Sequence, residues 1–68
     1  MIYQIKIKGT LDESWADWLS DAQISSTESE DGTWITTLVC DVPDSPALFG
    51  ILDRIRDLNL TLISMTQI

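Results

Sequence analysis

The chain has 68 residues, of which 44% are hydrophobic and 22% charged, as in small globular proteins rather than disordered ones. Eleven acidic against four basic residues give a net charge of −7, which argues against nucleic acids and anionic membrane surfaces as partners. One cysteine and no histidine exclude an internal disulfide, a zinc site and a histidine base. We expect a single domain over residues 1–68, with no cofactor and no metal.

The small size of the chain limits how stable it can be alone. Below about 70–80 residues one core rarely supplies more than about 3–5 kcal/mol, and small folds usually rely on disulfides, metals or oligomerisation. Association is the route that this composition leaves open. No segment resembles a signal or transit peptide, and the longest uncharged stretch, residues 58–68, is too short and polar to cross a bilayer. We therefore expect a cytoplasmic protein with no membrane partner.

The first half of the chain begins with a strand and a helix. Alternation of apolar and polar side chains predicts a strand over residues 2–8, which Gly9 ends. Thr10 and Glu13 form a capping box, which predicts a helix over residues 11–20. The apolar stripe expected to pack this helix on a sheet consists of Leu11, Trp15, Trp18 and Leu19.

A hairpin is expected to follow this helix. Residues 22–29 are rich in Ser and Thr and predict a solvated edge strand. Asp31 and Gly32 favour a tight turn, because glycine adopts positive φ without steric cost. Residues 33–42 form the clearest strand, and apolar side chains occupy both of its faces.

The last part of the chain predicts a second helix and a final strand. Ser45 is a suitable N-cap and Pro46 suits the first helical position. Asn59 is expected in the left-handed region after the helix, and residues 60–67 form a strand with apolar groups at both parities. The buried stripe expected on this helix is Leu48, Ile51, Leu52, Ile55 and Leu58.

This order of elements is β-α-β-β-α-β, which indicates an α+β, ferredoxin-like fold. Its sheet has four antiparallel strands in the spatial order four, one, three, two, with two helices on one face. The polar second strand then lies at an edge, in agreement with its composition.

The other face of such a sheet is polar when a domain is monomeric. Here the third and fourth strands have apolar residues at both parities, which predicts an apolar open face covered by a partner. The alternative is that bulges or twist alter the parity, so that one face is core and the rest lies at strand ends. Trp34 suits either an interface or the core. The interface candidates are Ile2, Trp34, Ile63 and Met65.

Candidate chemical groups give no catalytic set, so we expect no enzyme. The acidic residues lack a metal-binding spacing and are better explained as a solvated surface. Cys40 lies in an apolar strand and is expected to be an inert thiol. Ser and Thr have no histidine to activate them. Two basic pairs, Lys6 with Lys8 and Arg54 with Arg56, are more consistent with balancing nearby carboxylates than with an anion site.

Three blocks carry a resemblance that covers nearly the whole chain. Residues 11–18 (LDESWADW), residues 31–33 (DGT), and the helix over residues 47–58 with its IRDL end resemble a family of small bacterial proteins to which no activity is assigned. Members of that family often have His at the position of Phe49 and Gly at that of Asn59, so any role of that His is missing here.

A looser resemblance covers about half of the chain. Residues 41–48 (DVPDSPAL) and the strand over residues 60–64 are similar to part of the ACT domain. ACT domains are ferredoxin-like modules that pair with one another and bind small ligands, often amino acids, at the interface. The resemblance implies ligand-loop candidates at Asp41, Asp44 and Ser45, although the glycine that usually follows a proline in that loop is missing.

The sequence is consistent with two functions. The preferred one is a non-enzymatic module that acts as a homo-oligomer, dimer or higher, or binds a small protein partner through the open face of its sheet. The alternative is an ACT-like regulatory module that binds a small metabolite at a dimer interface. An enzyme ranks below both, because acid–base catalysis usually needs His or a close carboxylate pair.

Overall fold

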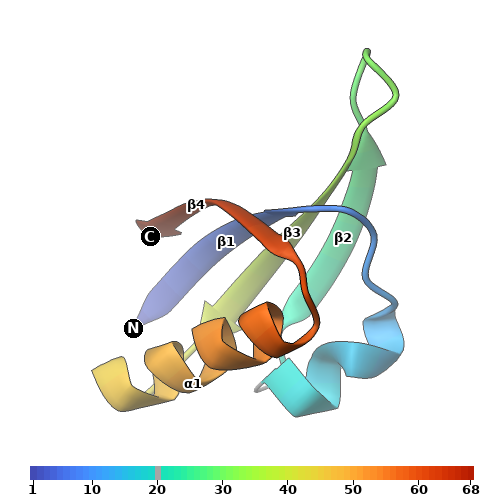
Figure 1. Cartoon of the computed structure of the whole chain (residues 1–68). Coiled ribbons are helices and arrows are strands. Elements are labelled where there is room, and N and C mark those ends of the chain that lie inside the picture. The colour runs from blue at the N-terminus through green and yellow to red at the C-terminus, as the bar shows by residue number, and fades with distance from the viewer. Residues whose placement is uncertain (20) are drawn as a thin grey trace.

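The computed structural model describes residues 1–19 and 21–68, except for the side chains of Glu13 and Trp18. The described part is a small α+β structure with four strands, one α-helix and one 3-10 helix, shown in Figure 1. In chain order the elements are β1 (Ile2–Lys8), η1 (Glu13–Leu19), β2 (Gln23–Glu28), β3 (Trp34–Asp41), α1 (Ser45–Asp57) and β4 (Thr61–Gln67).

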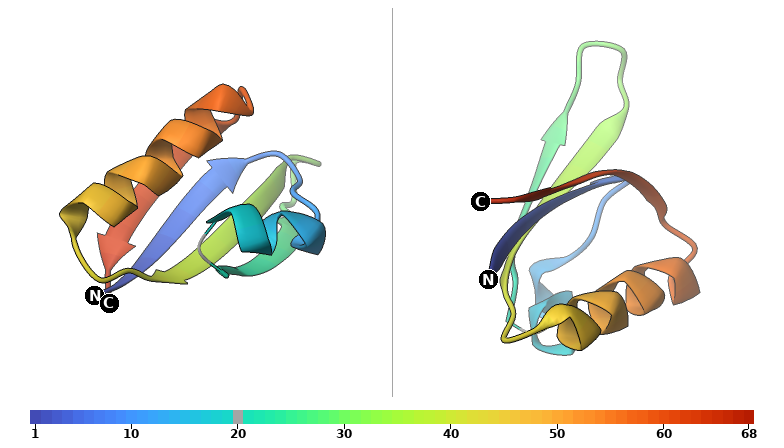
Figure 2. Two further views of the ribbon diagram at one scale, coloured as in Figure 1. Left: turned by 90° about the horizontal axis from the view of Figure 1, so that it is seen from below. Right: turned by 90° about the vertical axis from the view of Figure 1, so that its left-hand side faces the viewer.

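The four strands form one antiparallel sheet in the order β2-β3-β1-β4. This confirms the predicted strand order and the predicted edge position of β2. Both helical elements lie on one side of the sheet, with α1 along β4 and η1 against β2 (Figure 2). The two termini lie together, because the Ile68 N–H donates a 2.8 Å hydrogen bond to the Ile2 carbonyl oxygen.

The predicted ferredoxin-like βαββαβ class is wrong, because the described residues form one α-helix instead of two. The expected first helix is replaced by the seven-residue 3-10 helix η1. Asp, Ser and Trp are weak helix formers, and such a short segment gains little from α-helical propagation. The Asp12 Oδ1 accepts from the Ser14 N–H at 3.0 Å at the start of this segment. The predicted capping box of Thr10 and Glu13 depends on the Glu13 side chain, which lies outside the described part of the chain.

The tighter helical period of η1 changes which of its side chains face the core. With about three residues per turn, positions 16 and 19 align instead of 15 and 19. Accordingly Leu19 is buried and Ala16 packs against the core, whereas Trp15 is exposed. The expected packing of Trp18 falls on a side chain outside the described part of the chain.

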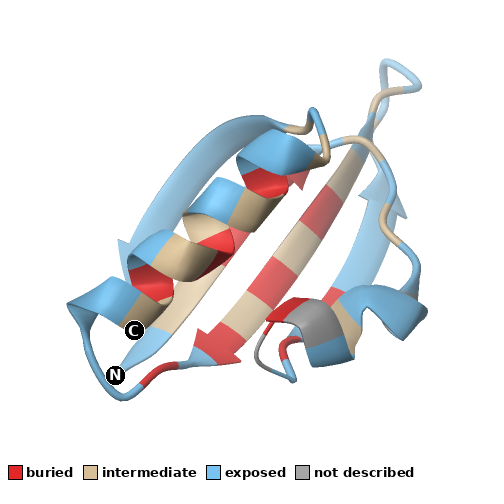
Figure 3. Cartoon of the chain, turned by 60° about the horizontal axis from the view of Figure 1, so that its bottom comes forward, coloured by how far each residue is buried: buried red, intermediate tan, exposed pale blue. Residues whose placement is uncertain are grey.

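The core lies between the sheet and α1 (Figure 3). Alternate residues of β1 and β3 point to this side, as the burial patterns of the two strands show. From α1 the buried residues are Leu48, Ile51 and Ile55, three members of the predicted stripe. The remaining core side chains are Ile5, Ile7, Leu19, Ala22, Ile24, Leu38, Cys40 and Val42.

The ends of α1 are fixed by local hydrogen bonds. Asp44, not Ser45, is the N-cap, and its Oδ1 accepts from the Ala47 N–H at 3.0 Å. At the other end Asn59 has a φ of 60°, which confirms its predicted left-handed conformation. The Leu60 N–H then donates to the Ile55 carbonyl oxygen at 3.2 Å, which satisfies a carbonyl of the last helical turn.

The predicted hairpin is confirmed between β2 and β3. The Gly32 N–H donates to the Ser29 carbonyl oxygen at 3.0 Å, and Gly32 has a φ of 84°. The Asp31 carboxylate accepts from the Ser29 hydroxyl and from the Thr33 N–H at 2.9 Å. These bonds hold the pKa of the exposed Asp31 at about 2, below its ordinary value of 3.8.

Candidate interaction surface

The register of the sheet decides which side chains lie on the open face, opposite α1. Lys6 lies between Thr37 of β3 and Ser64 of β4, and Lys8 lies between Ile35 and Thr61. The outer residues of β2 continue these rows, because Ser25 pairs with Thr37. Further side chains on this face are Ile2, Gln4, Gln23, Thr27, Val39 and Thr66.

The open face is therefore mostly polar. Its apolar members are Ile2, Ile35 and Val39, and its other members are Lys, Gln, Ser and Thr, apart from Asp41 at one end. Asp41 pairs with the N-terminal ammonium at 3.4 Å. The sequence predicts apolar side chains across this face. The register instead places Leu62 and Met65 of β4 on the helix side of the sheet.

The strand β4 carries the largest set of exposed apolar side chains in the described part of the chain. Every residue from Thr61 to Gln67 is exposed. Leu62, Ile63 and Met65 have exposed fractions of 46%, 48% and 41%. Since β1 pairs on only one side of β4, the other side is a free strand edge.

A bulge near the start of β4 explains why strict alternation along the sequence does not predict which face its apolar residues occupy. The register shifts between Lys6 and Ile7, so that Ser64 is opposite Lys6 and Leu62 is opposite Ile7. Ile63 has no residue opposite it. Met65 is opposite the core residue Ile5. Leu62 and Met65 therefore lie on the helix side of the sheet, beside its free edge.

The backbone of β4 presents hydrogen-bonding groups at this edge. In an antiparallel pair, successive residues direct their N–H and C=O alternately toward and away from the neighbouring strand. Because the Ile68 N–H bonds to Ile2 of β1, Thr66 and Ser64 also face β1. Met65 and Gln67 therefore direct their backbone groups away from the sheet, where a further strand can bind.

Charge distinguishes this edge from the one at β2. No residue from 58 to 68 is charged, although the chain carries a net charge of −7. By contrast β2 ends at Glu28 and is followed by Glu30 and Asp31. An uncharged, exposed edge with apolar side chains is typical of strands that pair with another strand.

The structure brings three of the four predicted interface residues onto neighbouring strands. Ile63 and Met65 lie on β4, and Ile2 lies beside Ile68 at the end of β1. Trp34 is 42% exposed and lies apart, at the hairpin end of β3. Ile63 and Met65 lie on the edge strand, whereas Ile2 lies one strand further in, on β1. Ile2 is on the open face and Met65 on the helix side, so the candidates do not share one face.

Leu62 and Phe49 are among the exposed apolar residues that the sequence did not single out as interface candidates. Leu62 is on β4, where the bulge places it on the helix side of the sheet, and no sequence pattern showed that bulge. Phe49 on α1 is 60% exposed. Its position outside the apolar stripe of that helix was the available signal.

Two of the three predicted ligand-loop residues make local contacts. Asp44 caps α1 through the Ala47 N–H, and Asp41 contacts the N-terminus. Ser45 is the exposed first residue of α1. A ligand carboxylate could bind the Ala47 N–H only by displacing the Asp44 side chain.

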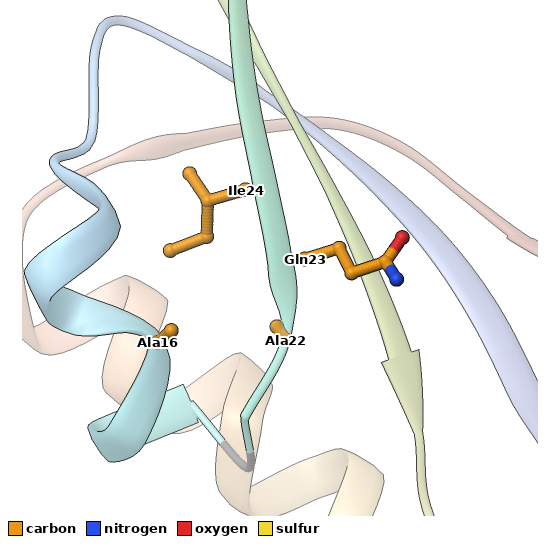
Figure 4. Close-up of a pocket in the computed structure, with 4 residues that line it drawn as sticks. All are labelled: Ala16, Ala22, Gln23 and Ile24. Atoms are coloured by element: carbon orange, nitrogen blue, oxygen red, sulfur yellow. The ribbon is translucent and has the colours of Figure 1, made fainter.

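Other chemical groups form no catalytic arrangement among the described residues. Cys40 is fully buried, and burial raises the pKa of its thiol. No group of three Cys, Asp or Glu side chains within residues 1–19 and 21–68 is placed to hold a metal ion. A hollow of about 350 Å³ between η1 and β2 is lined by Ala16, Ala22, Gln23 and Ile24. None of these four is acidic, basic or nucleophilic, and Figure 4 shows the Gln23 amide directed away from Ala16.

Comparisons with known proteins assign no activity. A family model described as a domain of unknown function (DUF8691) matches residues 2–66. No curated protein and no solved structure matches the chain. Within the described residues, no helix has the length and apolar character needed to cross a membrane.

Proposed function

The chain belongs to the DUF8691 family, whose description names no activity, and we propose that it is a non-enzymatic protein-interaction module that binds a partner strand along the free edge of β4. The observation that carries this proposal is that β4 is an edge strand, exposed at every residue and without charge. The partner strand would extend the sheet beyond β4.

Two kinds of contact would supply affinity and selectivity in this mode of binding. Main-chain hydrogen bonds to Met65 and Gln67 would hold the added strand, as in other cases of strand addition. Side chains of the added strand that point to the helix side would pack against Leu62 and Met65, which already expose apolar surface there. The same contacts would withdraw an aggregation-prone edge from solvent.

The ACT-like alternative has less support. It requires a ligand at the loop before α1, where Asp44 is already the helix cap. The single α-helix also differs from the ferredoxin-like frame that the resemblance implied. We therefore place the interaction at β4.

Strand addition can be tested with a labelled peptide that has the sequence of β4, residues 60–68. Fluorescence anisotropy is expected to rise on titration with the full chain. Hydrogen exchange of the Met65 and Gln67 amides should slow in the same complex, because they gain acceptors. A second peptide with lysines added at both ends probes whether a basic strand is preferred. If neither peptide binds and both amides exchange freely, the proposal fails.

A further inference from the structure

Building on the proposed strand addition, we propose that the strand bound at β4 is the β4 strand of a second copy of this chain. The two β4 strands would run antiparallel about a two-fold axis near Met65, joining two four-stranded sheets into one continuous sheet. This inference names the partner that the proposed function leaves open, and it depends on that function.

Charge is the first argument for a second copy. Two chains of −7 repel each other, so a stable contact between them must avoid their acidic surfaces. Residues 58–68 are the longest stretch of the sequence without a charged residue. This stretch contains β4 and lies at the sheet edge opposite the acidic hairpin after β2. Pairing through β4 therefore brings two copies together at uncharged segments, with no carboxylate in either pairing strand.

Self-complementarity is the second argument. A two-fold axis between antiparallel strands places a residue opposite its own copy, and the central residue must direct its backbone outward. Met65 meets this requirement, and it lies one position from Ser64, the middle of the Thr61–Gln67 strand. The Met65 N–H of each copy would then donate to the Met65 carbonyl oxygen of the other. Both Met65 side chains would lie next to each other on the helix side.

The exposed apolar side chains of β4 are the third argument. An axis perpendicular to the sheet keeps α1 of both copies on the same side. Leu62 and Met65 project to that side and are 46% and 41% exposed in the single chain. In the paired sheet the Met65 side chains would meet across the axis, and Leu62 would lie opposite Ile68 of the other copy, so that each copy supplies apolar surface to the other.

The test uses backbone and charge variants of the full chain, followed by sedimentation equilibrium from micromolar to millimolar concentration. Met65→Pro removes the outward N–H, and proline is tolerated on an edge strand where the N–H faces solvent. Met65→Ala removes the same side chain but keeps the N–H. The wild type is expected at twice the 7.6 kDa of one chain and Met65→Pro at one chain, whereas Met65→Ala should remain largely paired. Circular dichroism checks that each variant is folded.

A charge variant covers the case in which Met65→Pro does not fold. Met65→Lys keeps the N–H but places two ammonium groups together at the two-fold axis. It is expected to weaken pairing by at least about tenfold, which corresponds to about 1.4 kcal/mol. Gln4→Lys adds the same charge on the open face of β1 and should leave the mass of the paired form unchanged.

The outcomes separate this inference from the proposed function. A wild type that stays at one chain while the β4 peptide binds overturns the second copy but leaves strand addition standing. A wild type at one chain that also fails to bind either peptide overturns both. Two-chain mass that survives in both Met65→Pro and Met65→Lys shows pairing through another surface and also overturns the inference.

Discussion

The hydroxyl of Thr36 donates a 2.7 Å hydrogen bond to the Gly9 carbonyl oxygen. The Thr36 Oγ1 also lies 2.9 Å from the Ser26 Oγ, and it accepts from the Ser26 hydroxyl because the single hydroxyl proton of Thr36 is donated to Gly9. Thr36 is fully buried, and these bonds connect β2 and β3 to the residue that follows β1. One side chain therefore links three segments at the hairpin end of the sheet.

Replacing Thr36 with Val tests the value of this link. The variant keeps the shape of the side chain but leaves the Gly9 carbonyl oxygen and the Ser26 hydroxyl without this partner. We expect the free energy of unfolding to fall by about 1–3 kcal/mol, measured by urea denaturation. Thr37→Val on the open face is the control and should change it by less than about 0.5 kcal/mol. Equal effects of the two variants would contradict a specific role for the Thr36 hydroxyl.

The cap of α1 gives a second prediction. Asp44→Ala removes the acceptor of the Ala47 N–H and should lower the free energy of unfolding by about 0.5–2 kcal/mol. Ser45→Ala changes the residue that the sequence favoured as the cap and should have little effect. Urea denaturation of both variants distinguishes the two positions. A larger loss in Ser45→Ala would show that the cap is assigned to the wrong residue.

Asp31 gives a prediction for the pH dependence of stability. Its folded pKa, about 2, lies below the ordinary 3.8, so the folded state favours the charged carboxylate. The stabilisation is fully present above pH 3.8 and is lost as the pH falls through about 2. We expect Asp31→Asn to lose part of the acid-dependent decrease in melting temperature over this interval. Identical pH profiles for the two proteins would contradict the assignment.

The sheet could be predicted from the sequence because local signals agree with tertiary packing there. Alternation in β1, the turn at Gly32 and the left-handed Asn59 each fix one element or connection. The polar composition of β2 was enough to place it at an edge. These features depend on neighbouring residues only, which is why they can be inferred without coordinates.

The first helical segment could not be predicted because two periods fit the same residues. Leu11, Trp15 and Leu19 suit an α-helix, whereas Ala16 and Leu19 suit a 3-10 helix. The Asp12 side chain competes with the α-helical pattern by binding the Ser14 N–H. In the structure the 3-10 segment packs against β2, a contact that involves residues distant from the local pattern.

The candidate site was predicted only in part, because parity counts assume a regular strand. In a regular strand Leu62 and Met65, three positions apart, would point to opposite faces of the sheet. The bulge at Ile63 places both on the same side. Ile63 and Met65 were chosen as members of an open face, and the structure places them at a free edge. The edge position of β4 was implicit in the predicted strand order, but its exposure required coordinates.

Salt gives the last prediction, which concerns the proposed pair of chains. Two copies of charge −7 repel each other at low ionic strength, and salt screens this repulsion over a Debye length of about 10 Å at 0.1 M. Because the uncharged β4 contact itself loses little to screening, we expect the dissociation constant to fall as sodium chloride is raised. The lysine-extended peptide is the matched control, since its binding to the acidic chain should weaken over the same series. Sedimentation equilibrium and anisotropy provide the two measurements. A dissociation constant of the paired chains that rises with salt would show a contact between opposite charges, which β4 cannot supply because residues 58–68 carry none.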